Sequence, residues 1–315
     1  MDVVIAIGEV IIGFILLLKG ADFFVDGAAA LAARLGIPQI VIGLTVVAFG
    51  TSAPEAAVSI SAGIKGNNGI SIGNVVGSNI FNILIILGVT AVITTLSVRK
   101  ETVKVDIPVM IGATILMVVW GMLGKTLTKI TGVIFLLILF SYIGYLVYYS
   151  KKNGADDGED IKELKGWMIP VFILGGLAAI IFGSNITVTG SSTLASMMGV
   201  SDRVIGLTIV ALGTSLPELM TSLTAAKKGN ADIAIGNIVG SNIFNILFIL
   251  GITTLLIDLP YVSDTADFTI DGIVALISAV VLWVITFKTG KLKRRDGILM
   301  LAMYLVYFIY LAVGK

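Results

Sequence analysis

Long apolar runs, separated by short polar stretches, occupy almost the whole chain. A helix needs about 20 mostly apolar residues to cross the hydrocarbon core of a bilayer. Runs of this kind predict an all-α polytopic membrane protein with ten transmembrane helices, at 3–33, 39–64, 69–95, 104–124, 128–149, 167–198, 204–226, 231–257, 266–287 and 296–313. The first and the sixth are long for straight spans, so we expect them to tilt or to protrude.

The composition supports a membrane protein and excludes several kinds of chemistry. Hydrophobic residues make up 57% of the chain and charged residues only 13%, whereas soluble domains carry about 25% charged residues. Cys and His are both absent, which argues against thiolate catalysis, disulfides and transition-metal sites. We therefore expect no enzyme and no cofactor. The net charge of +1 indicates no nucleic-acid partner, and no protein partner is implied beyond the surrounding lipid bilayer.

Two segments, 43–88 and 206–251, have closely similar sequences. Aligned without a gap, 31 of their 46 positions are identical, at a constant offset of 163 residues. A weaker similarity extends upstream, between 20–37 and 183–200. Each copy places one glutamate inside an otherwise apolar stretch, and a carboxylate at membrane depth indicates a functional site.

The repeat also divides the chain. The first half, 1–150, and the second half, 167–315, hold five predicted spans each, and a charged linker, 151–166, joins them. Because five is odd, the second half must cross the membrane in the opposite sense. Two inverted halves with a shared site at their interface are the layout of a secondary transporter.

The charges of the loops predict the orientation. With both termini outside, the inner loops carry 15 Lys and Arg residues and the outer loops 5, as the positive-inside rule requires. The linker is then cytoplasmic. The start of the chain, MDVVIAIGEV, has no basic segment typical of a signal peptide, so we expect the first span to be retained. We expect a multi-pass protein of the cell membrane.

A helix break lies beside each buried glutamate, in the motifs GTSAPE (50–55) and GTSLPE (213–218). Proline removes a backbone donor and clashes with the preceding turn. We therefore expect the helix to kink or unwind and to free carbonyls from about Ala48 to Thr51 and from Ala211 to Thr214. Irregular backbone at this depth is tolerated only where it is buried in protein or lines a cavity.

Polar residues recur at helical spacing after each break. One face of each of four helices is expected to present a polar stripe, formed by Ser52, Glu55 and Ser59; Ser215, Glu218 and Ser222; Asn74, Ser78 and Asn82; and Asn237, Ser241 and Asn245. Every donor in these stripes is oxygen, as are the freed carbonyls. All-oxygen sites suit Ca²⁺, Mg²⁺ and Na⁺, and Ca²⁺ tolerates irregular ligand sets better than Mg²⁺ does.

Some of these polar residues also fit a purely structural role. Ser, Thr and Asn often bridge membrane helices, and Ser59, Ser222, Asn79 and Asn242 fit that interpretation better than a ligand role. Even the two glutamates could be neutral and bridge helices, although this would leave the duplicated helix break unexplained. Three further acids are left out of the predicted site, namely Asp22, Asp26 and Asp106.

The duplicated motifs resemble the α-repeats of the cation/Ca²⁺ antiporter superfamily. In each half G-T-S-x-P-E is followed by G-N-x-x-G-S-N-I-F-N, and the first motif is similar to that of the Na⁺/Ca²⁺ exchanger branches. Within that superfamily the chain resembles the prokaryotic type of exchanger, because its 151–166 linker is too short to hold large regulatory domains. It also implies that Glu55 and Glu218 are the central Ca²⁺ ligands, with main-chain carbonyls of Thr51 and Thr214. Na⁺ sites would share the glutamates with Ala48, Ser52, Ser78, Asn82, Ala211, Ser215, Ser241 and Asn245.

One departure from that resemblance is informative. Potassium-dependent relatives carry Asp at the position of Asn245, so Asn here argues against K⁺ co-transport. Family members exchange about three Na⁺ for one Ca²⁺, and with two carboxylates the site charge sums to 0 with one Ca²⁺ and to +1 with three Na⁺. The cycle is then expected to be electrogenic.

The sequence thus predicts an alternating-access antiporter in which Na⁺ and Ca²⁺ compete for one site built around two glutamates. The long first and sixth spans are the expected gating elements. One alternative is a Ca²⁺/H⁺ exchanger that uses the same glutamates as proton acceptors. A cation channel, which also needs carboxylates, is a second alternative.

Overall fold

The structure is a computed structural model that describes residues 2–153, 164–198, 211–263 and 267–313. Nearly all of these residues are helical, because the long apolar runs satisfy their backbone groups internally. The first half contains α1 (Asp2–Leu35), α2 (Gln39–Ile42), η1 (Gly43–Val47), α3 (Ala48–Thr51), α4 (Ala53–Ile64), α5 (Asn68–Phe81), η2 (Asn82–Leu87), α6 (Gly88–Ile93), η3 (Thr102–Asp106), α7 (Ile107–Gly124) and α8 (Lys129–Asn153). The second contains α9 (Met168–Met197), α11 (Ala211–Thr214), α12 (Leu216–Lys227), α13 (Ala231–Phe244), η5 (Asn245–Leu250), α14 (Gly251–Leu256), α15 (Thr269–Thr289) and α16 (Arg294–Val313).

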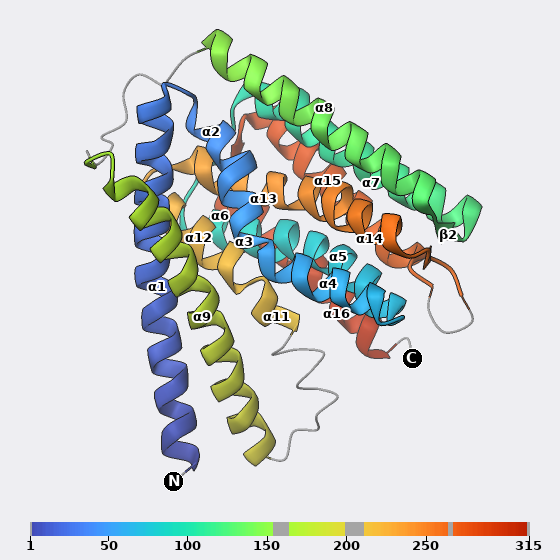
Figure 1. Ribbon diagram of the computed structural model, residues 1–315, viewed down its shortest axis with the longest axis horizontal. Helices are drawn as coiled ribbons and strands as arrows, with labels where there is room; N and C mark the ends of the chain where they lie inside the picture. Colours follow the sequence, from blue (N-terminus) through green and yellow to red (C-terminus); the bar gives the residue numbers. More distant parts are fainter. Residues whose placement is uncertain (1, 154–163, 199–210, 264–266, 314–315) are drawn as a thin grey trace.

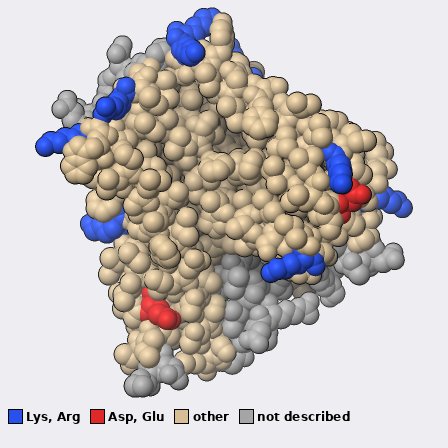
Figure 2. All heavy atoms as spheres, in the orientation of Figure 1, with Lys and Arg blue, Asp and Glu red and all other residues tan. Residues whose placement is uncertain are grey.

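Most of the predicted spans are present as continuous helices. Within the described residues, eight helical stretches are long and apolar enough to cross a membrane, and the bent pair Gln39–Thr51 and Ala53–Ile64 makes a ninth. The predicted span 204–226 begins among residues that are not described, and its described part is α11 and α12. Figure 2 shows one face of the molecule that is almost entirely uncharged, with Lys and Arg mainly at its edges, as lipid contact requires.

Helices α1 and α9 form a separate antiparallel pair at one side of the molecule (Figure 1). Glycines allow their backbones to approach closely. A Cβ built on Gly20 would lie 2.8 Å from the Gly176 carbonyl oxygen, and one on Gly183 would lie 2.8 Å from the Gly13 carbonyl oxygen. We call this line of close contact between α1 and α9 the seam. Its glycines recur every seven residues on both helices, at 13, 20 and 27 and at 176, 183 and 190.

Two short antiparallel ladders join loops of the two halves. β1 (Leu96–Ser97) pairs with β4 (Lys291–Leu292), and β2 (Thr126–Leu127) pairs with β3 (Leu259–Pro260). Each ladder therefore links one loop from the first half to one loop from the second. This exchange of equivalent strands ties the two halves together.

Each half also contains one tyrosine–aspartate contact of its own, buried in the first half and partly buried in the second. The Tyr142 hydroxyl donates to Asp106 Oδ1 at 2.8 Å, and the Tyr307 hydroxyl donates to Asp271 Oδ1 at 2.7 Å. The first contact joins the start of the fourth span to the fifth, and the second joins α15 to α16. Asp106, which the sequence left without a role, thus has a structural partner within its own half.

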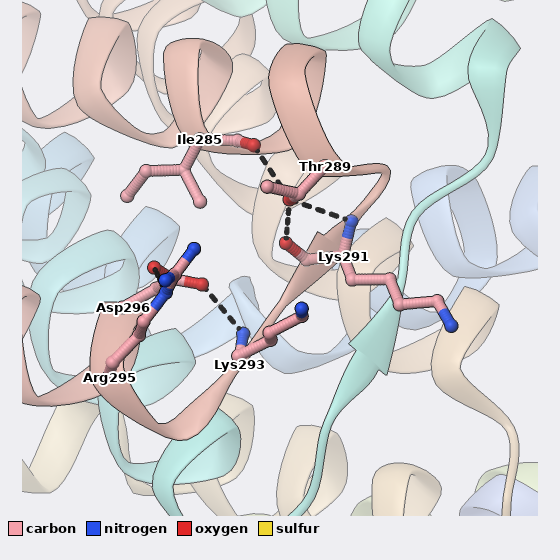
Figure 3. Close-up of polar contacts among 6 residues, drawn as sticks. All are labelled: Ile285, Thr289, Lys291, Lys293, Arg295 and Asp296. Carbon is pink, nitrogen blue, oxygen red and sulfur yellow. Dashed lines mark hydrogen bonds and ion pairs between the residues drawn. The ribbon is translucent and has the colours of Figure 1, made fainter.

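The turn between α15 and α16 is held by side chains that bind its backbone (Figure 3). The Thr289 hydroxyl lies 2.6 Å from the Lys291 carbonyl oxygen and 2.8 Å from the Ile285 carbonyl oxygen. Asp296 accepts a hydrogen bond from the Lys293 amide at 2.9 Å, as an acidic residue in the first helical turn does in a capping box. β4, which lies in this turn, pairs with β1.

Helices α5 and α13 pass through the centre of the molecule. The most apolar stretch of the α13–α14 span is 94% buried, whereas the corresponding stretches of α1 and of α16 are each 22% buried. Gly236 and Gly240 make room for the first half of the bent span, since a Cβ on Gly240 would lie 2.7 Å from the Leu44 carbonyl oxygen. The polar residues of α5 and α13 are therefore shielded from lipid, as the predicted stripes require.

Candidate functional site

The bent span brings the first glutamate into the protein interior. The axis turns by 50° between Gln39–Thr51 and Ala53–Ile64, and Ser52 lies at the break. Pro54 occupies the first turn of α4, where its missing N–H has no helical partner to lose. One expectation was wrong in detail, because the Ala48 carbonyl keeps a hydrogen bond from the Ser52 amide at 3.0 Å. The chain bends at Ser52 without unwinding the turn before it.

The second copy repeats this arrangement. Ser215 lies at the break before α12, Pro217 occupies the first turn, and Glu218 follows in that turn. The Ser215 amide donates to the Leu212 carbonyl at 3.2 Å, a tighter turn than in the first copy. Ala211, whose side chain is not described, begins α11.

The two glutamates are both buried, and each is bound by the other half of the chain. Only 1% of Glu55 and 1% of Glu218 is exposed. The Ser52 hydroxyl donates to Glu218 Oε1 at 2.9 Å, and the Ser215 hydroxyl lies 3.4 Å from Glu55 Oε1. Since each serine comes from the opposite copy, the two carboxylates belong to one site and not to two.

Two asparagines hold the backbone around the glutamates. Asn237 Nδ2 lies 2.8 Å from the Ser222 hydroxyl and 3.3 Å from the Glu218 carbonyl oxygen. Its Oδ1 accepts a hydrogen bond from the Thr51 hydroxyl at 2.9 Å. Asn74 repeats the first two contacts with Ser59 and the Glu55 carbonyl, at 2.9 and 3.4 Å. These asparagines, predicted as part of the polar stripes, therefore brace the site.

Four further asparagines cross the centre in a symmetric arrangement. Asn79 Nδ2 donates to the Asn242 carbonyl and Asn242 Nδ2 donates to the Asn79 carbonyl, both at 3.2 Å. Their Oδ1 atoms consequently accept, from Asn245 Nδ2 and from Asn82 Nδ2 respectively, both at 3.0 Å. The amide nitrogens of Asn82 and Asn245 donate these hydrogen bonds, so their side-chain oxygens point away from the asparagine bridge formed by Asn79 and Asn242.

Several oxygens at the site receive no hydrogen bond from any described group. They are Oε2 of both glutamates, Oδ1 of Asn82 and of Asn245, and the Ser241 hydroxyl oxygen. An unpaired buried acceptor is costly, and a buried carboxylate without a counter-charge is more so. Neither glutamate takes part in an ion pair among the described residues. The arrangement thus suits a desolvated cation with oxygen ligands.

Most of the predicted ligands are brought together by these contacts. Thr51, Ser52, Glu55, Ser215 and Glu218 are linked directly or through Asn237. Ser78, Ser241, Asn82 and Asn245 are buried on the two central spans. Thr214 ends α11 next to Ser215. The structural interpretation of Asn79 and Asn242 is confirmed, and Ser59 and Ser222 bind the two bracing asparagines.

Comparison with known proteins identifies similar sequences over nearly the whole chain. The sequence profile of the family described as Sodium/calcium exchanger protein matches residues 5–149 and 168–313. The putative antiporter CaxA of Alkalimonas amylolytica is 39% identical over 308 residues, which are 95% of this chain and 96% of that protein. The sodium/calcium exchanger MaX1 of Methanosarcina acetivorans is 34% identical over 341 residues, covering 96% and 97% of the two chains.

Solved structures also resemble this chain over nearly its whole length. The sodium-calcium exchanger NCX_Mj, soaked with zero Na⁺ and Ca²⁺, superimposes with a TM-score of 0.86 at 36% identity, over 98% of this chain and 99% of that one. The same exchanger soaked with 10 mM Na⁺ and 10 mM Sr²⁺ gives a TM-score of 0.85 at 35% identity, over 99% of both chains. The similarity therefore includes fold and sequence together.

Proposed function

Because this chain belongs to the sodium/calcium exchanger family of membrane antiporters, we propose that it exchanges Na⁺ for Ca²⁺ by alternating access at one site built around Glu55 and Glu218. The observation that carries the proposal is the crossed binding of the glutamates. Each accepts a hydrogen bond from a serine of the opposite copy through Oε1, while Oε2 accepts none from any described group.

The ligand set that we assign to Ca²⁺ combines the two glutamates with main-chain oxygens at the helix breaks. Glu55 and Glu218 supply the carboxylates, and Thr51 and Thr214 lie at the two helix breaks and supply main-chain carbonyls. Ca²⁺ accepts six to eight oxygen ligands in irregular geometry, so carboxylates and carbonyls of this kind suit it. The absence of His from the chain leaves no imidazole to favour a transition metal.

Na⁺ is assigned to the same glutamates, together with neighbouring oxygens. These come from Ala48, Ser52, Ser78 and Asn82 in the first half, and from Ala211, Ser215, Ser241 and Asn245 in the second. Since both ions need the same carboxylates, occupancy by one excludes the other. This competition couples the two fluxes.

The charge of the site sets the electrical behaviour of the cycle. Two carboxylates with one Ca²⁺ sum to 0, and two carboxylates with three Na⁺ sum to +1. With this stoichiometry each cycle moves net charge across the membrane. The neutral side chains of Asn82 and Asn245 supply no third carboxylate, which supports exchange that does not require K⁺.

The layout of the chain supports alternating access. We assign residues 1–150 and 167–315 to two inverted five-helix repeats that make ten spans, with 151–166 as a cytoplasmic linker and both termini outside. The antiparallel α1–α9 pair is then the gating element, and its two helices approach closely at glycines of both. The protein is a multi-pass membrane protein, which we place in the cell membrane.

Calcium binding to the detergent-solubilised protein tests the site directly. Titration calorimetry of the wild-type protein should show saturable Ca²⁺ binding that weakens as Na⁺ is added. Glu55→Gln and Glu218→Gln should each lower the Ca²⁺ affinity by more than about 100-fold, because a ligating buried carboxylate is lost. Glu101→Gln, an exposed glutamate on the helical turn just before η3, is the matched control and should bind like wild type.

Two results would overturn the proposal. Undiminished Ca²⁺ binding by both glutamine variants would place the site elsewhere. Binding that responds to pH but not to Na⁺ would favour a Ca²⁺/H⁺ exchanger that uses the same carboxylates.

A further inference from the structure

Two acids of α1, left outside the predicted site, bind a lysine on the turn between α12 and α13. Lys228 Nζ lies 2.6 Å from Asp26 Oδ1 and 3.4 Å from Asp22 Oδ1. The same ammonium donates to the Asp22 carbonyl oxygen at 2.9 Å. The side chains of Asp26 and Lys228 are 17% and 28% exposed, so water screens this contact only in part.

This contact joins two parts of the molecule that the proposed cycle moves relative to each other. Asp22 and Asp26 lie on α1, one member of the gating pair. Lys228 directly follows α12, the helix that carries Glu218. A charged contact between these elements must break or rearrange if α1 slides past the turn, and it therefore stabilises the arrangement seen here.

The equivalent contact cannot form at the other end of the molecule. The repeat offset of 163 residues relates Lys228 to Lys65, on the turn between α4 and α5. The same offset relates Asp22 and Asp26 to Asn185 and Thr189 on α9. The lysine is kept in both copies, but its acidic partners are present in only one.

A second ion pair lies at the same end of the molecule, beside this turn. Arg99, which follows β1, binds Asp232 at the start of α13. The repeat offset relates these residues to Val262 and Gly69, which carry no charge. Instead, a hollow of about 380 Å³ lies between the α4–α5 turn and the loop after β3, lined by Gly66, Asn67, Asn68, Gly69, Ile70, Pro260 and Ser263.

We propose that the Asp22/Asp26–Lys228 contact is a one-sided latch that favours the state in which α1 rests against the α12–α13 turn, and so makes the two faces of the exchanger unequal. The proposal rests on the proposed function, because only a cycle with two states gives the latch something to bias. A pair of inverted repeats without such a contact would have nearly equivalent states. The latch makes one state more populated, which raises the apparent ion affinity on the face where that state binds.

Distances between spin labels test the latch without any transport measurement. The chain contains no cysteine, so labels attach only where cysteines are introduced, at exposed Ala33 on α1 and exposed Tyr148 on α8. In ion-free detergent the doubly labelled protein should give one dominant distance. Lys228→Gln and, independently, Asp26→Asn should each broaden the distribution or shift it to a second distance. Lys65→Gln, the matched control, should leave it unchanged.

Exchanging the charges separates the latch from a merely structural role. Asp26→Lys combined with Lys228→Asp should restore the dominant distance that the single changes lose. In proteoliposomes the ratio of half-saturating Ca²⁺ concentrations on the two faces should change about two- to five-fold in Lys228→Gln, the range for a partly exposed ion pair.

The latch is contradicted if Lys228→Gln and Asp26→Asn both keep the wild-type distance distribution. It is equally contradicted if Lys65→Gln shifts the distances as much as Lys228→Gln. Failure of the exchanger assignment would appear separately, as wild-type protein that shows no Na⁺-driven Ca²⁺ flux.

Discussion

The side-chain amides at the centre decide which oxygens are left without a hydrogen bond from a described group. Asn79 and Asn242 donate to each other's backbone carbonyls, which fixes the orientation of both amides. That orientation draws in the amide nitrogens of Asn82 and Asn245 and leaves their oxygens open. Two asparagines with a structural role thereby leave two others with the open oxygens that we propose as ion ligands.

A third carboxylate at the centre should relocate the voltage-dependent step of transport. With Asn245→Asp the site carries −3, so that it sums to −1 with one Ca²⁺ and to 0 with three Na⁺. The Ca²⁺-loaded site is neutral in the wild type, so Ca²⁺/Ca²⁺ self-exchange in proteoliposomes should be insensitive to membrane potential. In Asn245→Asp the same flux should become voltage-dependent, because a charged site now crosses the field.

The pseudo-symmetric change Asn82→Asp provides the comparison for this prediction. It adds the same charge from the other half of the chain and should have the same effect on self-exchange. Self-exchange that remains insensitive to voltage in both variants would show that neither position carries charge through the field with the ion.

The sequence was sufficient to propose ligands but not to identify the residues that support them. A glutamate beside a proline in an apolar run is unusual enough to be recognised, and its duplication identified Glu55 and Glu218 together. The roles of Asn74 and Asn237 depend instead on contacts with Ser59, Ser222 and Thr51. Helical spacing placed these asparagines on the polar face, but it could not distinguish a brace from a ligand.

At the scale of elements, the α1–α9 seam is the feature most sensitive to side-chain size. A Cβ on Gly176 would lie 2.6 Å from the Phe24 amide nitrogen and 2.8 Å from the Gly20 carbonyl oxygen. Backbone atoms cannot move aside as the end of a side chain can. The seam therefore keeps the two long helices at a fixed, short separation.

Alanine at two adjacent glycines of α9 should have different effects on stability. Gly176→Ala should destabilise the protein by about 1–3 kcal/mol, the usual effect of overpacking, and lower its Tm in detergent. Gly175→Ala is the matched control, since a Cβ there meets no described atom within 4 Å, and it should leave the Tm near the wild-type value. Equal Tm values for the two variants would contradict the close approach of α1 and α9.

The signal for this seam was present in the sequence. Glycines at intervals of seven residues mark one face of each long span, and the repeat offset relates the two sets to each other. The unusual length of the first and sixth spans sets them apart in the sequence, but length alone does not say which helices pair. The ion pairs of Lys228 and Arg99 were not predictable in this way, because they join residues 202 and 133 positions apart.

At the scale of the whole molecule, one set of contacts is shared by both halves and another set is found at one end. The crossed serines, the two ladders and the asparagine bridge are shared by both halves, and they build one site from two copies. Among the described residues, the ion pairs of Lys228 and of Arg99 have no equivalent at the other end. A symmetric site with unequal ends is what an exchanger needs if its two faces are to handle the same ions differently.

Sodium-driven calcium uptake by the reconstituted protein tests this account most directly. Liposomes loaded with Na⁺ and diluted into Na⁺-free medium should take up radiolabelled Ca²⁺, and the uptake should collapse when choline replaces the internal Na⁺ at constant pH. Glu218→Gln, reconstituted in parallel, should show no uptake above empty liposomes. Uptake that is indifferent to internal Na⁺ and is driven instead by an outward proton gradient would contradict the account and withdraw the sodium-site assignments.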